Sequence, residues 1–459
     1  MNPFTVAVRN VRKSFRDYGI YFLTVMLGVA LFYIFNSINS QNIMVDLGRD
    51  ELMKMVGVGR MMDTLSYFVV TILAFLILYA NSFLIRRRKK EMGLYTILGM
   101  KKRKISSILM WETFLVGTLS LAVGLAIGVF LSQGMALLTA KIFGLSITRF
   151  AFSFSVDALY KSVKYFGITF LVVTAFNVIN LNRQKLPELL YADKKTTQMV
   201  KLPLWASVTL FILSAGMLAA AYCLITGAGM NGFFEEARRW ALEASILLGI
   251  AGTFLFFFAL SGFFLKLISG IKRIYWKNLN AFTLKQINSK IHTTWISMSF
   301  VCLMLFLSLT TFSLGTSMSI AIRAYDVDET AAAVGVTYIT TYIGIVFLIS
   351  CASVLAVSQL SEASDNQTRY ALLFKLGASS KMLASSVFKQ NLIYFAAPLI
   401  LAIVHAFVAV NVLSSMVNAL ATLNIFAMCV ITGGVVVLIY GGYFLTTYRN
   451  ARKTALREF

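Results

Sequence analysis

The chain has 459 residues, of which 58% are hydrophobic and only 13% are charged, and its formal net charge is +23. Charged residues make up about a quarter of an ordinary soluble domain, so this composition excludes a soluble globular protein. The positive charge lies in short clusters beside apolar stretches rather than on one long basic surface. Such clusters are typical of contacts with anionic lipid, and we predict a lipid bilayer and no nucleic acid as partner.

Ten apolar stretches divide the chain. Each has about 18 to 25 residues, and at ~1.5 Å of helix rise per residue this length crosses a hydrocarbon core of ~30 Å. With the N-terminus in the cytoplasm, most of the 42 Lys and Arg residues fall in cytoplasmic segments, as the positive-inside rule requires. We therefore predict an all-α polytopic protein of the plasma membrane, with both termini cytoplasmic and spans near residues 18–36, 65–85, 108–132, 163–181, 203–226, 245–268, 295–319, 335–359, 386–410 and 424–447.

Residues 1–17, which precede the first stretch, are basic and amphipathic. At helical spacing, Phe4 and Val8 fall on an apolar face, and Arg9 and Arg12 on a basic face. A helix of this kind lies along a membrane surface, so we expect it at the inner leaflet, with no cleavable signal peptide.

An internal repeat relates the two ends of the chain. Residues before the first and seventh stretches, and residues in the loops after the second and eighth, match at one constant offset. The offset predicts two parallel four-helix repeats, residues 18–200 and 271–459, related by a pseudo-twofold axis along the membrane normal and flanking a two-helix insert, residues 201–270. The matching pairs are Asn2 and Asn280, Phe4 and Phe282, Thr5 and Thr283, Asn10 and Asn288, Leu94 and Leu372, Leu98 and Leu376, Gly99 and Gly377, and Ser107 and Ser385, while Lys290 stands at the position of Arg12 and Gln390 at that of Glu112.

The two matching cytoplasmic loops, residues 86–107 and 360–385, carry more than basic anchors. In the first loop, RRRKKEMGLYTILGMKKRK, a helical pattern runs as far as Gly99, which stands where a C-cap glycine would end the helix. Anchoring explains the basic residues, but it does not explain the Glu-Met-Gly-Leu and Leu-Gly-Met elements or their echo in RYALLFKLGAS.

The pattern E-x-G-L-x-x-x-L-G between two spans, followed by Glu112 at the next span, resembles the FtsX-like permeases of ABC transporters. The whole layout is most similar to the bacitracin- and lantibiotic-resistance permeases of Gram-positive bacteria. The resemblance implies a permease subunit that docks onto a cytoplasmic ABC ATPase dimer, which would bind ATP and Mg²⁺, with a membrane sensor histidine kinase as a further partner to test. The residues implied in ATPase coupling are Glu91, Gly93, Leu94, Leu98, Gly99 and Met100 in the first copy, and Arg369, Leu372, Leu373, Leu376 and Gly377 in the second.

The chain departs from that family in two places. Arg369 and Ala371 replace Glu91 and Gly93 in the second copy. The predicted outer loop 320–334 is also too short to hold the large extracellular domain that such permeases carry. The resemblance therefore favours an ATPase-coupled permease more strongly than it favours an antibiotic substrate. Two explanations of the short loop remain, a naturally compact permease and one from which the domain has been deleted.

No Walker motif, dinucleotide-binding glycine pattern or HExxH motif occurs in the sequence, so we predict no enzymatic activity and no metal site in this chain. His405 falls inside an apolar stretch, where a neutral, hydrogen-bonded side chain is a simpler interpretation than a proton pathway. Two other functions stay open, an ion-driven secondary transporter and a membrane scaffold that regulates a sensor kinase. A proton-driven transporter would need carboxylates near the membrane midplane, whereas Glu112 and Glu362 fall near its predicted cytoplasmic edge.

Overall fold

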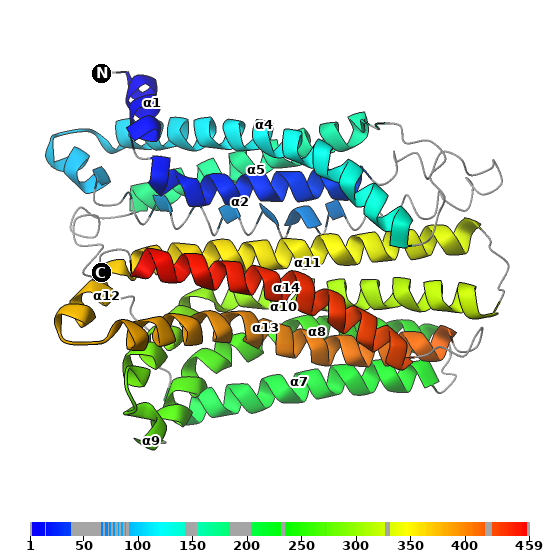
Figure 1. Ribbon diagram of the computed structural model, residues 1–459. Helices are drawn as coiled ribbons and strands as arrows, with labels where there is room; N and C mark the ends of the chain where they lie inside the picture. The colour runs from blue at the N-terminus through cyan, green and yellow to red at the C-terminus, as the bar shows by residue number, and fades with distance from the viewer. Residues whose placement is uncertain are drawn as a thin grey trace. The chain divides into compact units, whose positions relative to one another are not determined.

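The computed structural model describes residues 2–13, 15–37, 91–142, 154–183, 203–230, 235–270, 272–325, 331–417 and 425–456, with residue 152 and scattered residues between 66 and 88. All regular structure in these residues is helical, as the composition predicted. The chain divides into two compact units, Met1–Gln198 and Met199–Phe459, which are treated separately below (Figure 1).

In the described part of the first unit, the short amphipathic helix α1 (Pro3–Lys13) is followed by longer helices. The long helix α4 packs along α2 and α5, and α1 packs against α4. Glycines make the closest of these contacts possible, because a Cβ atom on Gly124 would lie only 2.6 Å from the carbonyl oxygen of Met26. The longer helices are α2 (Phe15–Asn36), α4 (Lys102–Ile142) and α5 (Val156–Arg183).

The second unit contains the remaining helices. The predicted insert forms a helix pair, α7 and α8, and this pair packs onto α10 and α13 within the same unit. Helix α10 also packs against α11, and α14 covers α11 and α13. The helices are α7 (Leu204–Met230), α8 (Glu235–Gly270), α9 (Lys272–Tyr275), α10 (Asn280–Tyr325), α11 (Ala331–Asp365), α12 (Gln367–Lys375), α13 (Ser380–Val417) and α14 (Ile425–Ala455).

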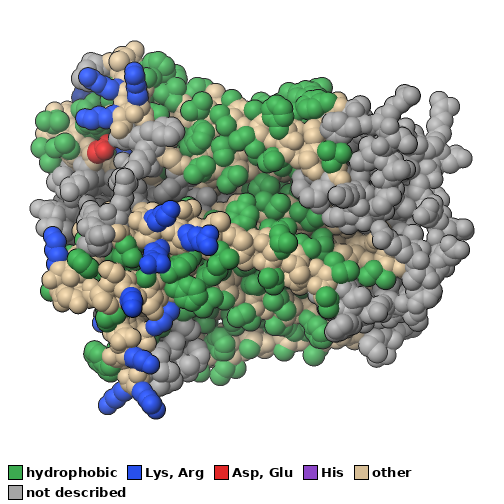
Figure 2. All heavy atoms as spheres, viewed as in Figure 1, with side chains coloured by type: hydrophobic (Ala, Val, Ile, Leu, Met, Phe, Trp, Pro, Cys, Tyr) green, Lys and Arg blue, Asp and Glu red, His purple; other side chains and the backbone are tan. Residues whose placement is uncertain are grey.

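Eight helices in the described part of the chain are long and apolar enough to cross a membrane, and each coincides with a predicted span. The first predicted span corresponds to the shorter apolar helix Tyr21–Asn36, and most of the second, 65–85, lies outside the described residues. Figure 2 shows hydrophobic side chains over the middle of the helices and Lys and Arg gathered toward one end, on the face that it draws.

His405 joins the α7–α8 pair to α13. The hydroxyl of Thr253 donates to the carbonyl oxygen of Gly249 at 2.7 Å, so its oxygen is left to accept from His405 Nε2 at 3.0 Å. Nδ1 then accepts from the hydroxyl of Tyr222 at 2.6 Å. Both ring nitrogens therefore have partners when the imidazole is neutral, as the sequence predicted, and the ring acts as a bridge between three helices.

Candidate functional site

The first candidate segment, residues 91–101, is a short helix closed by a tight turn. Gly99 has a φ of 83°, in the left-handed region that a residue with a Cβ rarely adopts. The N–H of Gly99 donates to the carbonyl of Thr96 at 3.1 Å, and the N–H of Met100 donates to the carbonyl of Tyr95 at 3.0 Å. These two bonds form a Schellman motif, and α4 begins directly after it.

The second segment, residues 369–379, ends in the same turn. Gly377 has a φ of 94°, its N–H donates to the carbonyl of Phe374 at 2.9 Å, and the N–H of Ala378 donates to the carbonyl of Leu373 at 3.0 Å. Helix α13 begins two residues later, and the carbonyl of Ser379 accepts the N–H of Leu383. The donors and acceptors of the two turns stand at matching positions of the predicted repeat.

Each turn presents leucine side chains to the outside. Leu98 is 72% exposed and Leu376 is 83% exposed, and each follows a second exposed leucine one helical turn earlier, Leu94 or Leu372. Exposed apolar side chains on a tight turn contribute nothing to the core of their own unit. They are therefore free to contact a partner.

Other predicted residues hold the segments in place. Met100 packs on a buried cluster that includes Met92 and Ile105, and Leu373 packs on one that includes Tyr370 and Leu383. Gly93 is buried, whereas Arg369 is exposed and donates to the side chain of Asn366 at 3.4 Å. The predicted set thus separates into exposed leucines and inward-facing supports. Ile97 and Phe374 are also exposed, and spacing alone could have added Ile97, which lies three residues after Leu94.

A buried ion pair supports the first turn. Arg88 Nη2 lies 2.7 Å from Glu112 Oε1, and the two side chains are only 3% and 1% exposed. Asn10, on α1, donates to the same carboxylate oxygen at 2.7 Å, and the more exposed Glu91 lies 3.2 Å from Arg88 Nε. Burial lowers the pKa of Arg88, but the neighbouring carboxylates raise that pKa by more, so the guanidinium stays charged. The pair therefore joins the residues before the turn to the helix after it.

A different polar network supports the second turn. Lys290 Nζ, on α10, lies 3.3 Å from Glu362 Oε2, on α11, and Asn366 donates to Glu362 Oε1 at 2.8 Å. Burial alone would raise the pKa of Glu362, but Lys290 and Asn366 hold the pKa of this carboxyl below its usual value. Gln390 stands at the repeat position of Glu112 and donates to the hydroxyl of Tyr370 at 2.9 Å. The contact across the second turn is therefore neutral.

Sequence reasoning missed these networks as units. The matched pairs Asn10 with Asn288 and Glu112 with Gln390 pointed to polar positions, but the partners Arg88 and Asn366 carry no sequence signal that separates them from surface residues. Among the described residues, no group of His, Cys, Asp and Glu side chains could hold a metal ion.

Comparison with known proteins finds a family match in part of this chain. Residues 64–180 match the family described as FtsX-like permease C-terminal, a range that contains the first segment and the Arg88–Glu112 pair. The chain therefore contains an FtsX-like permease domain, as the loop pattern predicted.

The particular relatives include the bacitracin export permease protein BceB of Bacillus subtilis (strain 168), 28% identical over 263 residues that cover 56% of this chain and 39% of that protein. BceB of Halalkalibacterium halodurans is 28% identical over 257 residues, covering 54% and 38%. The uncharacterized ABC transporter permease YvcS of Bacillus subtilis (strain 168) is 23% identical over 280 residues, covering 61% and 41%. The chain is thus homologous to bacitracin export permeases and matches about two fifths of the length of each (39%, 38% and 41%).

Proposed function

We propose that this chain is the membrane subunit of an ABC transporter, and that its two segments dock onto a cytoplasmic ATPase dimer that binds ATP and Mg²⁺. The observation that carries the proposal is the pair of identical turns that expose Leu98 and Leu376. Two copies of one docking element suit a partner with two similar subunits.

The rest of the predicted architecture belongs to the same proposal. Ten spans, cytoplasmic termini and two parallel repeats would put both turns on the ATPase side of the membrane. Eight apolar helices at predicted positions and the matching turns support this arrangement.

Mechanical transmission is the role that the supports of the turns suit. The Arg88–Glu112 pair ties the first turn to α1 and α4, and Tyr370 ties the second to α13. A push on either turn would therefore move membrane helices rather than a loose loop. Because two relatives are bacitracin export permeases, we propose transport, extraction or signalling in peptide-antibiotic resistance as the process served.

Affinity purification of the full chain from membranes of its own cells tests the docking. Exposed ion pairs contribute only about 0–1 kcal/mol to an interface, whereas a desolvated apolar anchor contributes ~2 kcal/mol or more, so the leucines should dominate. Leu98→Asp and Leu376→Asp should each reduce the ATPase activity that co-purifies with the chain by about tenfold or more, since ~1.4 kcal/mol is a factor of ten. We expect the larger loss at Leu98, because the first segment keeps both Glu91 and Gly93.

Trp276→Asp is the matched control, because this apolar residue is 73% exposed and lies between α9 and α10 in the chain, in neither of the two segments. Loss of ATPase with the control as well would indicate general damage. Retention of ATPase by both leucine variants would contradict the docking role, and an ion-dependent flux by the chain without any ATPase would favour a secondary transporter instead.

A further inference from the structure

The C-terminal end of α14 has two different faces. One face carries Ala451 and Ala455, each 1% exposed, which pack on the cluster that contains Tyr370 and Leu383 beside the second turn. The basic side chains of this end lie elsewhere on the helix and are exposed, namely Arg449, Arg452 and Lys453. Packing therefore holds the helix end in place while its basic side chains stay available.

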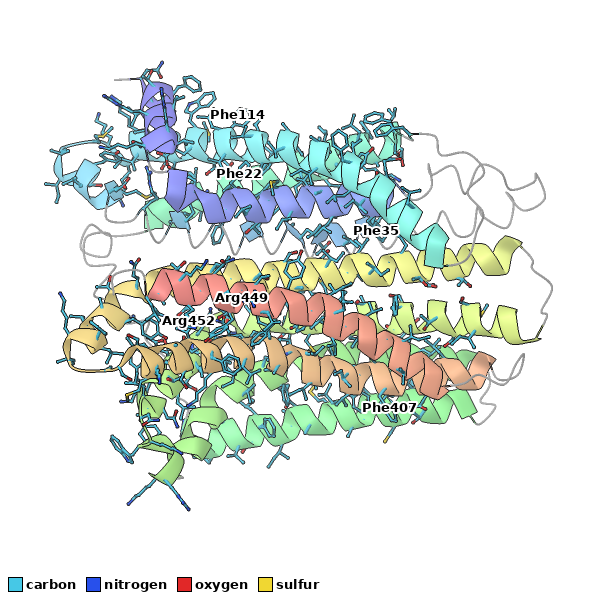
Figure 3. All side chains as sticks on the ribbon, viewed as in Figure 1. Phe22, Phe35, Phe114, Phe407, Arg449 and Arg452 are labelled. Atoms are coloured by element: carbon cyan, nitrogen blue, oxygen red, sulfur yellow. The ribbon has the colours of Figure 1, made fainter. Side chains whose placement is uncertain are left out.

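These basic side chains line a cavity of about 540 Å³. Ser380, the first residue of α13, and Tyr448 line it as well. Figure 3 labels Arg449 and Arg452 on this part of α14. The cavity thus collects two guanidinium groups, an ammonium group and hydroxyl groups from two helices.

The charged side chains that line this cavity are all basic. Arg449, Arg452 and Lys453 stand at positions i, i+3 and i+4, where like charges repel one another. Among the described residues, no carboxylate lines the cavity, and none of the ion pairs found there involves these three side chains. The helix dipole and the positive-inside rule account for basic residues at a helix end, but not for their convergence with Ser380 on one hollow.

We propose that this cavity binds a phosphate group, carried by an anionic phospholipid headgroup or by a soluble phosphate ester. Guanidinium groups match phosphate oxygens in a bidentate fork, an ammonium group adds a point charge, and the Ser380 hydroxyl adds a neutral donor. All three basic residues fall near the C-terminal end of the candidate membrane span Val430–Ala455, and the end of a span is where lipid headgroups lie.

A bound phosphate would also affect the second turn. It would draw the end of α14 toward Ser380, and Ala451 and Ala455 already pack on the cluster that supports Leu373. The inference does not depend on an ATPase, so it can fail or succeed separately from the proposed function.

The test uses the full chain purified in a neutral detergent. Native mass spectrometry and the thermal unfolding midpoint would be measured with phosphatidylglycerol, with phosphatidylcholine and with inorganic phosphate. We expect phosphatidylglycerol to bind more tightly than phosphatidylcholine, and R449Q/R452Q to weaken phosphatidylglycerol binding by about tenfold or more, as the loss of charge-assisted hydrogen bonds implies. The single variant K453Q should weaken it less, and serves if the double variant does not fold.

The matched control is K272Q/R273Q, which removes two exposed basic residues from α9 in the same unit, outside the cavity lining. This control should bind phosphatidylglycerol as the unaltered chain does. If inorganic phosphate raised the thermal unfolding midpoint as much as phosphatidylglycerol does, the result would support the phosphate site and identify a soluble ester as the source. The proposal would be overturned if the two lipids bound equally well and phosphate had no effect. It would also be overturned if the control and cavity variants lost phosphatidylglycerol binding equally, or if the cavity variants kept it unchanged.

Discussion

The two turns have the same backbone, but the side chains beneath them differ. Gly99 and Gly377 close the same Schellman motif, with donors and acceptors at matching positions. Below the first turn, the buried Arg88–Glu112 pair spans the turn itself. Below the second, the ion pair lies between α10 and α11, and neutral groups make the contact across the turn.

This difference shows that the shape of a turn and its buried support are separable. The shape needs only a glycine and local N–H and C=O groups, so two quite different sequences can produce it. The support needs side chains from distant parts of the chain, and charged and neutral solutions both satisfy the buried polar groups. The two solutions should respond differently to substitution.

The largest expected effect is at the charged support. Arg88→Leu would leave the buried Glu112 carboxylate without its cationic partner, and breaking a buried pair in this way costs about 3–5 kcal/mol. Thermal unfolding of the purified chain, followed by tryptophan fluorescence or helix content, would measure the loss. Glu91→Ala removes the exposed partner of the same arginine and should cost only about 0–1 kcal/mol.

The double variant R88L/E112L sharpens this comparison. It removes both charges, so it should recover much of the stability that Arg88→Leu loses. Equal destabilisation by Arg88→Leu and Glu91→Ala would mean that the buried pair does not support the first turn.

The neutral support should be weaker. Gln390→Leu removes the hydrogen bond to Tyr370 and leaves no buried charge behind, so we expect a loss of about 1–2 kcal/mol in the same unfolding measurement. Lys389→Leu alters the neighbouring, less buried residue, whose bond to Asn280 lies off the Tyr370 contact, and is the control. A loss at Gln390 as large as that at Arg88 would break the distinction between charged and neutral supports.

The turns themselves should respond alike. No heavy atom lies within 4 Å of a Cβ built on Gly99 or Gly377, so alanine meets no steric clash there, and its cost is the left-handed backbone alone. We expect Gly99→Ala and Gly377→Ala each to lose about 1 kcal/mol. Gly433→Ala, at a helical glycine with equally open surroundings, should lose no stability and is the control. Clearly unequal losses at the two turns would argue against their equivalence.

Local features of the fold could be predicted from the sequence, and long-range features could not. Apolar stretches of the right length predicted the eight described helices that could cross a membrane, because this signal lies within one element. A glycine after a helical pattern predicted the first turn, and the echo of its sequence pointed to the second. The Asn10–Glu112 bond joins residues far apart in the chain, and no pattern within either element indicates it.

The sequence also did not show which side of each short helix packs inward. Leu98 and Met100 are both apolar and stand two residues apart, yet one is exposed and the other packs inward. Which of them faces the core depends on where α4 passes, and that is a property of the packed unit. The repeat offset pointed to both turns, but it could not separate the side chains that pack inward from those that are exposed.

The smallest expected effect is the pH response of the second support. The pKa of Glu362 lies below its usual value in the folded chain, so the pair with Lys290 adds stability above the pKa of the unfolded carboxyl, about 4.3. This stability is lost as the pH falls through the lower, folded pKa. At pH 7 the chain should therefore unfold at a higher temperature than the Glu362→Gln variant. The difference should shrink below about pH 4.3, while the Arg369→Gln control, which keeps Lys290 and Asn366 beside the carboxyl, should retain most of the response. A difference between the chain and Glu362→Gln that persists undiminished to pH 3 would mean that protonation of Glu362 does not weaken the second support.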